Sequence, residues 1–269
     1  MEVNPKISVL MGVHNADLFI LREAVESILN QSYQNFEFII VDDINSNEVS
    51  EYLVQLTLLD SRIHLIKNNL NMGLTKSLCK ATEIATGVLF ARQDSDDVSE
   101  LNRFKEQIDK FVENPHLVLV GTWYTLKFVN GRVRSYHPND DNKEIRKTLY
   151  HNNSICHSSA MFKKSAYDQV GGYDPNYITT QDLDLWFRLV RVGFVGFVTK
   201  ELVKRTLYRN SMSLSKKTFL QLWNGLKIRW RERSIYPGYG ASLVIILGSI
   251  KHLISIFYLF FKQALRPNV

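Results

Sequence analysis

Cysteine and proline are scarce in this chain of 269 residues, which has two cysteines and six prolines. Cys79 and Cys156 stand far apart and form no paired spacing, which argues against a disulfide framework and a cysteine-based zinc site. The first residues, Met-Glu-Val-Asn-Pro-Lys, lack the apolar core of a secretion signal. We therefore expect the main part of the chain to lie in reducing cytoplasm.

Two further features are missing. No Gly-x-Gly-x-x-Gly turn follows the first apolar run, which argues against a dinucleotide-dependent oxidoreductase, and no internal repeat or low-complexity tract is present. Acidic residues are fewer than basic ones, since the chain has 27 aspartates and glutamates and 33 lysines and arginines. A net charge of +6 favours phosphate-bearing ligands or anionic membrane surfaces, and we expect no nucleic-acid partner.

Short apolar runs alternate with helical patterns through the first third of the chain, which is long enough to bury a full core. The predicted strands are residues 7–11, 36–41, 63–66 and 87–91, separated by helices at 18–29, 49–59 and a third ending near residue 85. Strands linked by helices favour parallel crossovers, which place all the carboxyl ends on one side of a sheet. The fold class expected is α/β, with a mostly parallel central sheet flanked by helices.

The second part of the main domain has a mixed pattern. It contains a helix at 102–111, a strand at 117–120, a hairpin at 124–136 that turns at Asn130 and Gly131, a strand at 159–162 and a helix at 182–192. This order predicts a mixed rather than purely parallel extension of the sheet.

The last part of the chain changes in composition. Residues 216–233 combine an apolar stripe at helical spacing with six lysines and arginines, which suits an anionic membrane surface. The alternative is that the stripe packs on the main domain. Residues 241–261 are nearly long enough to span a bilayer, but Lys251 and His252 interrupt them, so we expect an interfacial segment. The predicted division is a main domain at 1–215 and a membrane-associated helical tail at 216–269.

Two groups of carboxylates follow predicted strands. Asp42 and Asp43 end the second strand, and Asp94, Asp96 and Asp97 follow the fourth. Both groups are expected to face one cleft, because ligands of open α/β sheets bind at the carboxyl ends of the strands. Crowded carboxylates repel one another, and a divalent cation shared with a phosphorylated ligand relieves the repulsion. The alternative interpretation is an acidic, solvated turn.

A third acidic pair, Asp182 and Asp184, opens the predicted helix at 182–192. Acidic residues in a first turn often cap the helix and complement its dipole, so a purely structural role is one interpretation. The other is a functional carboxylate, because a polar loop precedes the pair.

With these motifs in place, the chain resembles the family 2 glycosyltransferases over residues 7–215. These are inverting enzymes of the GT-A fold that use nucleotide sugars. The matching segments, in chain order, are Ile7 to Asn15, Ser27 to Tyr33, Val41-Asp42-Asp43, Asn71-Met72-Gly73, Asp94-Ser95-Asp96-Asp97, Gly171-Gly172-Tyr173-Asp174 and Gln181 to Trp186. Each motif alone is weak, and the ordered set is specific.

The resemblance implies roles for individual residues. Asp43 would accept hydrogen bonds from the nucleotide base, in a pocket lined by Gly12, Val13 and His14, with the His14 ring stacked on the base.

Four positions would serve the rest of the reaction. Asp96 would bind Mg²⁺ or Mn²⁺ at the diphosphate, and Asp94, with Ser95 beside it in the donor site, would assist through the ribose or a metal-bound water. Asp182 would be the general base that takes the proton from the acceptor hydroxyl.

The resemblance also implies a substrate class. The donor would be a nucleotide diphosphate sugar, with a UDP-sugar the commonest choice, and the acceptor a saccharide or lipid-linked saccharide in surface polysaccharide biosynthesis. The enzyme would be bound peripherally to the inner face of the cell membrane. Two other hypotheses stay open: a non-catalytic module that binds nucleotide sugars or membranes, and a phosphatase of the haloacid-dehalogenase type, in which the first aspartate of the Asp-x-Asp motif is a nucleophile.

Overall fold

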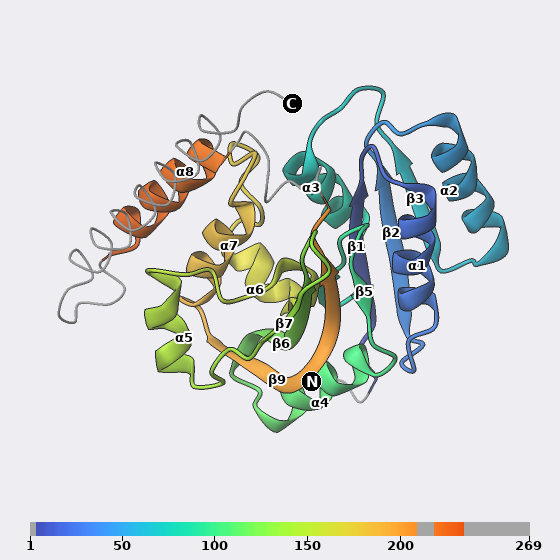
Figure 1. Ribbon diagram of the computed structural model, residues 1–269. Helices are drawn as coiled ribbons and strands as arrows, with labels where there is room; N and C mark the ends of the chain where they lie inside the picture. Colours follow the sequence, from blue (N-terminus) through green and yellow to red (C-terminus); the bar gives the residue numbers. More distant parts are fainter. Residues whose placement is uncertain (1–3, 209–217, 234–269) are drawn as a thin grey trace.

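The computed structural model describes residues 4–208 and 218–233, and a nine-stranded sheet lies at its centre (Figure 1). The strands are β1 (Ile7–Val13), β2 (Phe36–Asp42), β3 (Ile63–Lys67), β4 (Leu89–Arg92), β5 (Val98–Ser99), β6 (Leu117–Lys127), β7 (Val133–Tyr136), β8 (Met161–Lys163) and β9 (Phe194–Thr206). The helices are α1 (Leu18–Leu29), α2 (Asn47–Leu59), α3 (Leu74–Ile84), α4 (Arg103–Glu113), α5 (Asn142–Leu149), the 3₁₀ turn η1 (His157–Ser159), α6 (Lys164–Gln169), α7 (Gln181–Leu189) and α8 (Thr218–Arg231).

The strand order β3-β2-β1-β4-β8-β6-β9-β5 creates a switch point beside β1. The chain moves outward from β1 through β2 to β3 and then returns to β4 on the other side of β1, and all these pairings are parallel. Beyond β4 the strands β8 and β6 pair antiparallel, while β6 and β9 are parallel. Because ligands of open α/β sheets bind where the strand order reverses, the carboxyl ends of β1 and β4 are the expected site.

The sheet is covered on both faces, because successive side chains of a strand point in opposite directions. Ile7, Val9 and Met11 of β1 pack in one core with α1, α2 and α4, whereas Leu10 packs in a second core with α3, α6 and α7. In the ribbon, α1 and α2 lie beside β2 and β3, with α3 on the other side of β1 (Figure 1). Residues buried on both faces explain why these strands are continuous apolar runs.

Two local features fix the start of the fold. Asp17 caps α1, since its carboxylate accepts hydrogen bonds from the backbone N–H groups of Phe19 at 2.9 Å and Ile20 at 3.1 Å. Gly87 permits β4 to run against β1, because a Cβ atom at this position would lie only 2.6 Å from the backbone nitrogen of Ser8. Asp17 thus orders the chain after the carboxyl end of β1, and Gly87 permits the close pairing at the opposite, amino end of β1 and β4.

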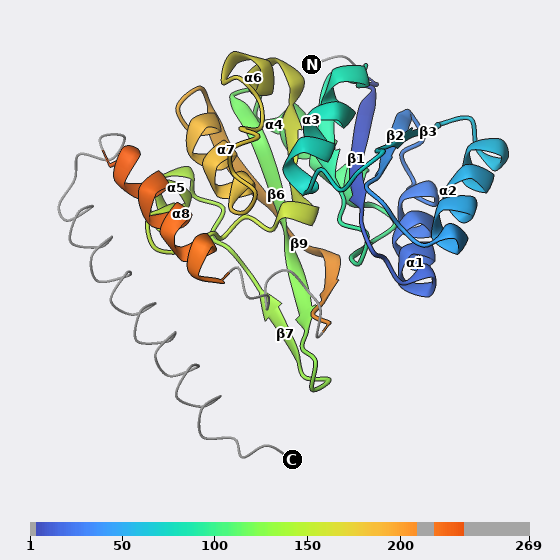
Figure 2. The same cartoon turned by 90° about the horizontal axis from the view of Figure 1, so that it is seen from above.

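The α/β class and the mostly parallel sheet flanked by helices are confirmed, as is the mixed second half. The predicted hairpin is β6–β7, with Gly131 at a φ of +81°, and it projects from the body of the molecule (Figure 2). Strand β9 and helices α5 and α6 were not predicted.

The C-terminal predictions are covered only in part. The boundary at 215–216 and the segment 241–261 lie outside the described residues, whereas α8 falls within the predicted helix at 216–233. None of the helices in residues 4–208 and 218–233 is long and apolar enough to cross a bilayer.

Candidate active site

Asp43 follows β2 and organises the loop that leads into α3. Its buried carboxylate accepts hydrogen bonds from the side-chain amide of Asn68 at 2.8 Å and from the backbone N–H groups of Met72 at 2.7 Å and Gly73 at 2.8 Å. One oxygen therefore receives two of these bonds and the other only one. Asp42, the neighbouring carboxylate, accepts hydrogen bonds from Asn45 in the loop after β2 and from Ser50 of α2.

His14 lies directly beyond β1, with both ring nitrogens engaged. Its Nδ1 lies 2.6 Å from the carbonyl oxygen of Asp43 and therefore carries the proton, while Nε2 accepts from the side-chain amide of Asn71 at 2.9 Å. These bonds fix the edges of an exposed imidazole and leave its faces available for stacking.

The other two residues predicted to line this pocket contribute through the backbone. Val13 is fully buried, and its carbonyl accepts from Asp43 and Asn45. Gly12 lies beneath α3, where a Cβ would approach the Leu74 side chain to 3.0 Å.

The acidic cluster after β4 contains three carboxylates in different surroundings. Asp94 is bound by Arg92 and by Ser158 Oγ at 2.7 Å. Burial opposes its ionisation, but the Arg92 and His157 environment outweighs this effect and holds the pKa of Asp94 at about 2. Asp97 is buried, accepts from Ser158 and forms an ion pair with Arg205 at 3.3 Å, and burial raises its pKa to about 6.

Asp96 differs from both neighbours. Burial, with the adjacent charges of Asp97 and Asp94, raises the pKa of Asp96 to about 7. No lysine, arginine or histidine of the described chain lies within ion-pair distance of it. Ser95, the other predicted residue of this segment, stands between Asp94 and Asp96 in the chain and is partly buried. A divalent cation would relieve the repulsion that Asp96 experiences.

A metal would need further ligands. Within the part of the chain that the structure describes, no three His, Cys, Asp and Glu side chains are arranged to hold an ion by themselves. Mg²⁺ is usually bound through one or two carboxylates plus substrate phosphates and water. One unpaired carboxylate at the cluster therefore fits a metal shared with a diphosphate.

Two buried arginines connect the acidic cluster to the neighbouring strand and helix. Arg92 is fully buried and donates to the Leu10 carbonyl, to Asp94 and, through Nε at 3.0 Å, to His157. Arg103, also fully buried, donates to the Arg92 carbonyl at 2.8 Å and to the Ser99 hydroxyl at 2.9 Å. These contacts hold β4 and α4 in a fixed relation, and they were not predicted.

His157 is kept neutral in this network. Its Nε2 lies 3.0 Å from Arg92 and 2.9 Å from the hydroxyl of Tyr173, and burial together with the Arg92 charge lowers its pKa to about 3. A neutral imidazole can accept from both partners, whereas a protonated one would face a guanidinium across a hydrogen bond.

Asp182 is the second residue of α7, which follows Thr180, a residue whose φ of +63° is rare for one with a side chain. Burial raises the pKa of Asp182, and the charge of Asp94 raises it further, while a 2.7 Å hydrogen bond from Asn153 opposes the shift. The His157 ring, which accepts from Arg92, also packs edge-on against Trp186 of α7 at 6.0 Å between ring centroids, so α7 lies close to the acidic cluster. A carboxylate with a raised pKa is suited to accept a proton.

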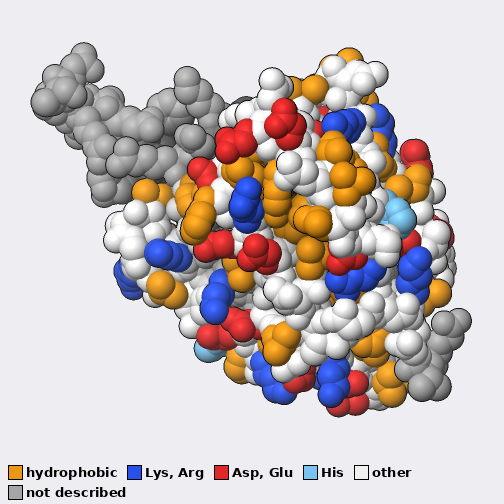
Figure 3. Space-filling model, turned by 90° about the vertical axis from the view of Figure 1, so that its right-hand side faces the viewer, with side chains coloured by type: hydrophobic (Ala, Val, Ile, Leu, Met, Phe, Trp, Pro, Cys, Tyr) orange, Lys and Arg blue, Asp and Glu red, His pale blue; other side chains and the backbone are white. Residues whose placement is uncertain are grey.

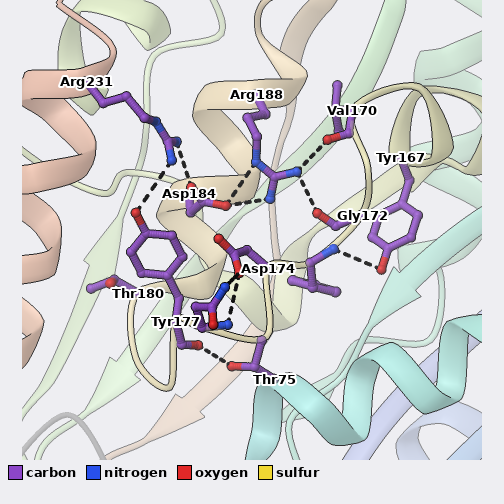
Figure 4. Close-up of polar contacts among 12 residues, drawn as sticks. Thr75, Tyr167, Val170, Gly172, Asp174, Tyr177, Thr180, Asp184, Arg188 and Arg231 are labelled. Atoms are coloured by element: carbon purple, nitrogen blue, oxygen red, sulfur yellow. Dashed lines mark hydrogen bonds and ion pairs between the residues drawn. The ribbon is translucent and has the colours of Figure 1, made fainter.

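Asp184, two residues later, is used within the fold. Its fully buried carboxylate accepts from Arg188 at 2.9 Å and from Arg231 of α8 at 2.7 Å, as the close-up shows (Figure 4). Arg188 continues the network to the carbonyl oxygens of Val170 and Gly172. Asp184 therefore ties together α7, α8 and the loop after α6, and it does not cap the helix.

Comparisons with known proteins agree with this architecture. Residues 8–171 match the sequence profile of glycosyl transferase family 2, which ends before α7. The chain is 35% identical to the putative glycosyltransferase EpsE of Bacillus subtilis over 206 residues, covering 75% of this chain and 72% of the relative. It is 33% identical to the O-antigen biosynthesis glycosyltransferase WbnJ of Escherichia coli over 198 residues, covering 71% and 74%.

A solved structure shares the fold. S. aureus TarS, residues 1–349, in complex with UDP, superimposes with a TM-score of 0.65 at 16% identity and covers 89% of this chain and 69% of its own.

Proposed function

The chain belongs to glycosyl transferase family 2 and is a glycosyltransferase, and from that premise we propose that it moves a sugar from a UDP-sugar to a saccharide or lipid-linked saccharide, with inversion at the anomeric carbon. The observation that carries the proposal is Asp182, a carboxylate whose pKa is raised by burial, at the start of α7, whose Trp186 packs against His157 beside the acidic cluster. The UDP complex of TarS supports the choice of nucleotide.

The donor would bind along the carboxyl ends of β1, β2 and β4. The exposed face of His14 would stack on the base, and Asp43 would accept from it through the oxygen that receives only one bond. The backbone of Gly12 and Val13 would close the pocket beneath. The diphosphate would then lie toward Asp94, Ser95 and Asp96.

Family 2 enzymes commonly use a divalent metal, and Mg²⁺ or Mn²⁺ would be held here by Asp96. When bound, such an ion neutralises negative charge on a leaving diphosphate. Asp94, kept ionised by Arg92, would orient the ribose or a metal-bound water. Asp97 would serve the loop itself through Arg205 and Ser158.

Asp182 would act on the other side of the sugar. Its carboxylate would accept the proton of the acceptor hydroxyl as that oxygen attacks the anomeric carbon opposite the nucleotide, so that one displacement inverts the configuration. Burial keeps the carboxylate more basic than an exposed aspartate. The O-antigen role of WbnJ supports a saccharide acceptor in surface polysaccharide biosynthesis.

We place the enzyme in the cytoplasm, attached peripherally to the inner face of the cell membrane. The support is the net charge of +6 together with the basic residues of α8. Attachment there would bring the active site to lipid-linked acceptors.

The non-catalytic module remains the second candidate, whereas membership of family 2 removes the basis of the phosphatase hypothesis. The deciding experiment incubates the full chain with a panel of nucleotide sugars, with and without Mn²⁺, and measures release of the nucleoside diphosphate. We expect metal-dependent release from one or a few UDP-sugars. Binding of a donor without release, in the presence of Mn²⁺ and cell-envelope saccharides, would establish the binding module instead.

A further inference from the structure

The outward face of α8 carries two tryptophans. Trp223 and Trp230 are 49% and 50% exposed, and exposed Lys227 lies between them at the i, i+4, i+7 spacing of one helix face. The inward face is formed by Asn224, Gly225 and Ile228. The largest apolar side chains of this helix therefore point away from the protein.

Each tryptophan has a cation against its ring. Lys227 Nζ lies 5.3 Å from the ring centroid of Trp223, and the guanidinium of Arg233 lies 4.7 Å from that of Trp230. Neither cation forms an ion pair among the described residues. Tryptophan rings flanked by lysine and arginine are typical of the interface between lipid headgroups and acyl chains.

The opposite face fixes the direction in which the tryptophans point. Arg231 binds Asp184, the Ile228 side chain is fully buried, and Arg229 Nε donates to the carbonyl of Leu149 at 3.0 Å. The Glu232 carbonyl accepts from the hydroxyl of Tyr150. Turning the tryptophans inward would break these contacts, so the Trp223–Lys227–Trp230 face is available to a partner.

The charge of α8 selects the kind of partner. Arg229 and Arg231 are used by the inward contacts, whereas Lys227 and Arg233 lie against the outward tryptophans. No aspartate or glutamate lies within α8, and Glu232, just beyond its end, is buried against Arg191 and Arg231. We propose that the Trp223–Lys227–Trp230 face docks on an anionic phospholipid surface. This inference rests on the membrane attachment proposed above, and it identifies the face of α8 that contacts the membrane.

Docking at this face has a consequence for the reaction. Arg231 joins α8 to Asp184, two residues beyond the proposed base (Figure 4). Asn224 lies 3.4 Å from the hydroxyl of Thr179 in the loop that precedes α7. The membrane-binding helix is thus built onto the helix that carries Asp182.

The test is co-sedimentation of the full chain with vesicles of phosphatidylglycerol and phosphatidylcholine, compared with phosphatidylcholine alone. Trp223→Ala/Trp230→Ala should lower partitioning onto the anionic vesicles by about tenfold or more. Lys227→Glu should lower it by about fivefold, with a steeper response to salt.

The matched control is Leu58→Ala/Leu59→Ala on α2, because both leucines are 82% exposed. The face over α1 and α2 carries such hydrophobic side chains among charged ones (Figure 3). This control should partition like the parent if docking is specific to α8.

Three results would overturn the proposal. The tryptophan variant could partition like the parent, or it could lower the melting temperature with partitioning unchanged, which would show that the two rings pack within the protein and do not meet lipid. It could also change the mass in solution, which would show a second copy there. Nucleotide-sugar hydrolysis without vesicles is measured alongside, so that loss of docking is distinguished from failure of the glycosyltransferase function.

Discussion

The side-chain amide of Asn153 donates a 2.7 Å hydrogen bond to the carboxylate of Asp182. The carbonyl oxygen of the same amide and the neighbouring Ser154 hydroxyl are buried without a protein partner in the described structure. Buried polar atoms in this condition are rare and usually meet water or a ligand. The loop between α5 and η1 therefore orients the proposed base and keeps two buried polar atoms available to water or a ligand.

Asn153→Ala should raise the pKa of Asp182. The amide stabilises the ionised carboxylate, so its loss leaves burial and the charge of Asp94 less opposed. Because a base must be deprotonated, transfer should fall by up to about tenfold on the acid side of neutrality and less on the alkaline side. NMR titration of the Asp182 carboxyl carbon, assigned with Asp182→Asn, measures the shift without any substrate. An unchanged pKa with lowered stability would show a merely structural role for Asn153.

Asp96 should bind metal in competition with protons. Its pKa of about 7 in the metal-free protein lies above the ordinary value, so its contribution to stability is present at low pH and is lost as the pH rises through about 7. Mn²⁺ with UDP should therefore raise the melting temperature more above pH 7 than below it. Asp96→Asn should remove this pH dependence and abolish metal-dependent turnover. Equal turnover after chelation would contradict the assignment.

His14→Ala should weaken UDP binding by about fivefold, since stacking of an aromatic ring on a base contributes roughly 1 kcal/mol or more. His14→Phe keeps a stacking face but loses the bonds to the Asp43 carbonyl and to Asn71, so it should recover part of the affinity. Calorimetry with UDP and Mn²⁺ measures both variants. Equal affinity of parent and alanine variant would exclude stacking at this position.

The first half of the fold was predictable because its signals are local. The strands β1, β2, β3 and β4 are apolar runs bounded by turn residues, and the alternation with helices fixes their parallel order. The carboxylates at the ends of β2 and β4 could be placed at one edge for the same reason.

Strand β9 could not be predicted in this way. Gly196 and the charged pairs Lys200-Glu201 and Lys204-Arg205 interrupt its apolar pattern, and it is ordered by pairing with distant β6. As a result the ion pair between Arg205 and Asp97 was missed. Arg92 carried a signal, a charged residue ending a buried strand, but its partners Leu10 and His157 are distant in sequence.

Asp182 and Asp184 provide a matched pair, since both lie in the first turn of α7 but in different surroundings. Asp182→Asn removes a carboxylate whose ionisation is opposed by burial, so stability should be unchanged or slightly higher. Asp184→Asn removes the shared partner of Arg188 and Arg231, and because both arginines are partly exposed the cost should be about 1–3 kcal/mol.

For activity, Asp182→Asn should be the more damaging of the two substitutions, whereas for stability it is Asp184→Asn. A general base contributes ~10²–10⁴-fold to rate, so Asp182→Asn should lower sugar transfer by that factor with UDP affinity unchanged, because Asp43, His14 and the metal at Asp96 set donor binding. Asp184→Asn, measured well below its melting temperature, should keep most of the transfer rate. Chemical denaturation, calorimetry with UDP and single-turnover transfer, applied to both variants, separate the two roles. If Asp182→Asn transfers sugar at the parental rate, or if Asp184→Asn is the inactive variant with its fold intact, then the base is not Asp182.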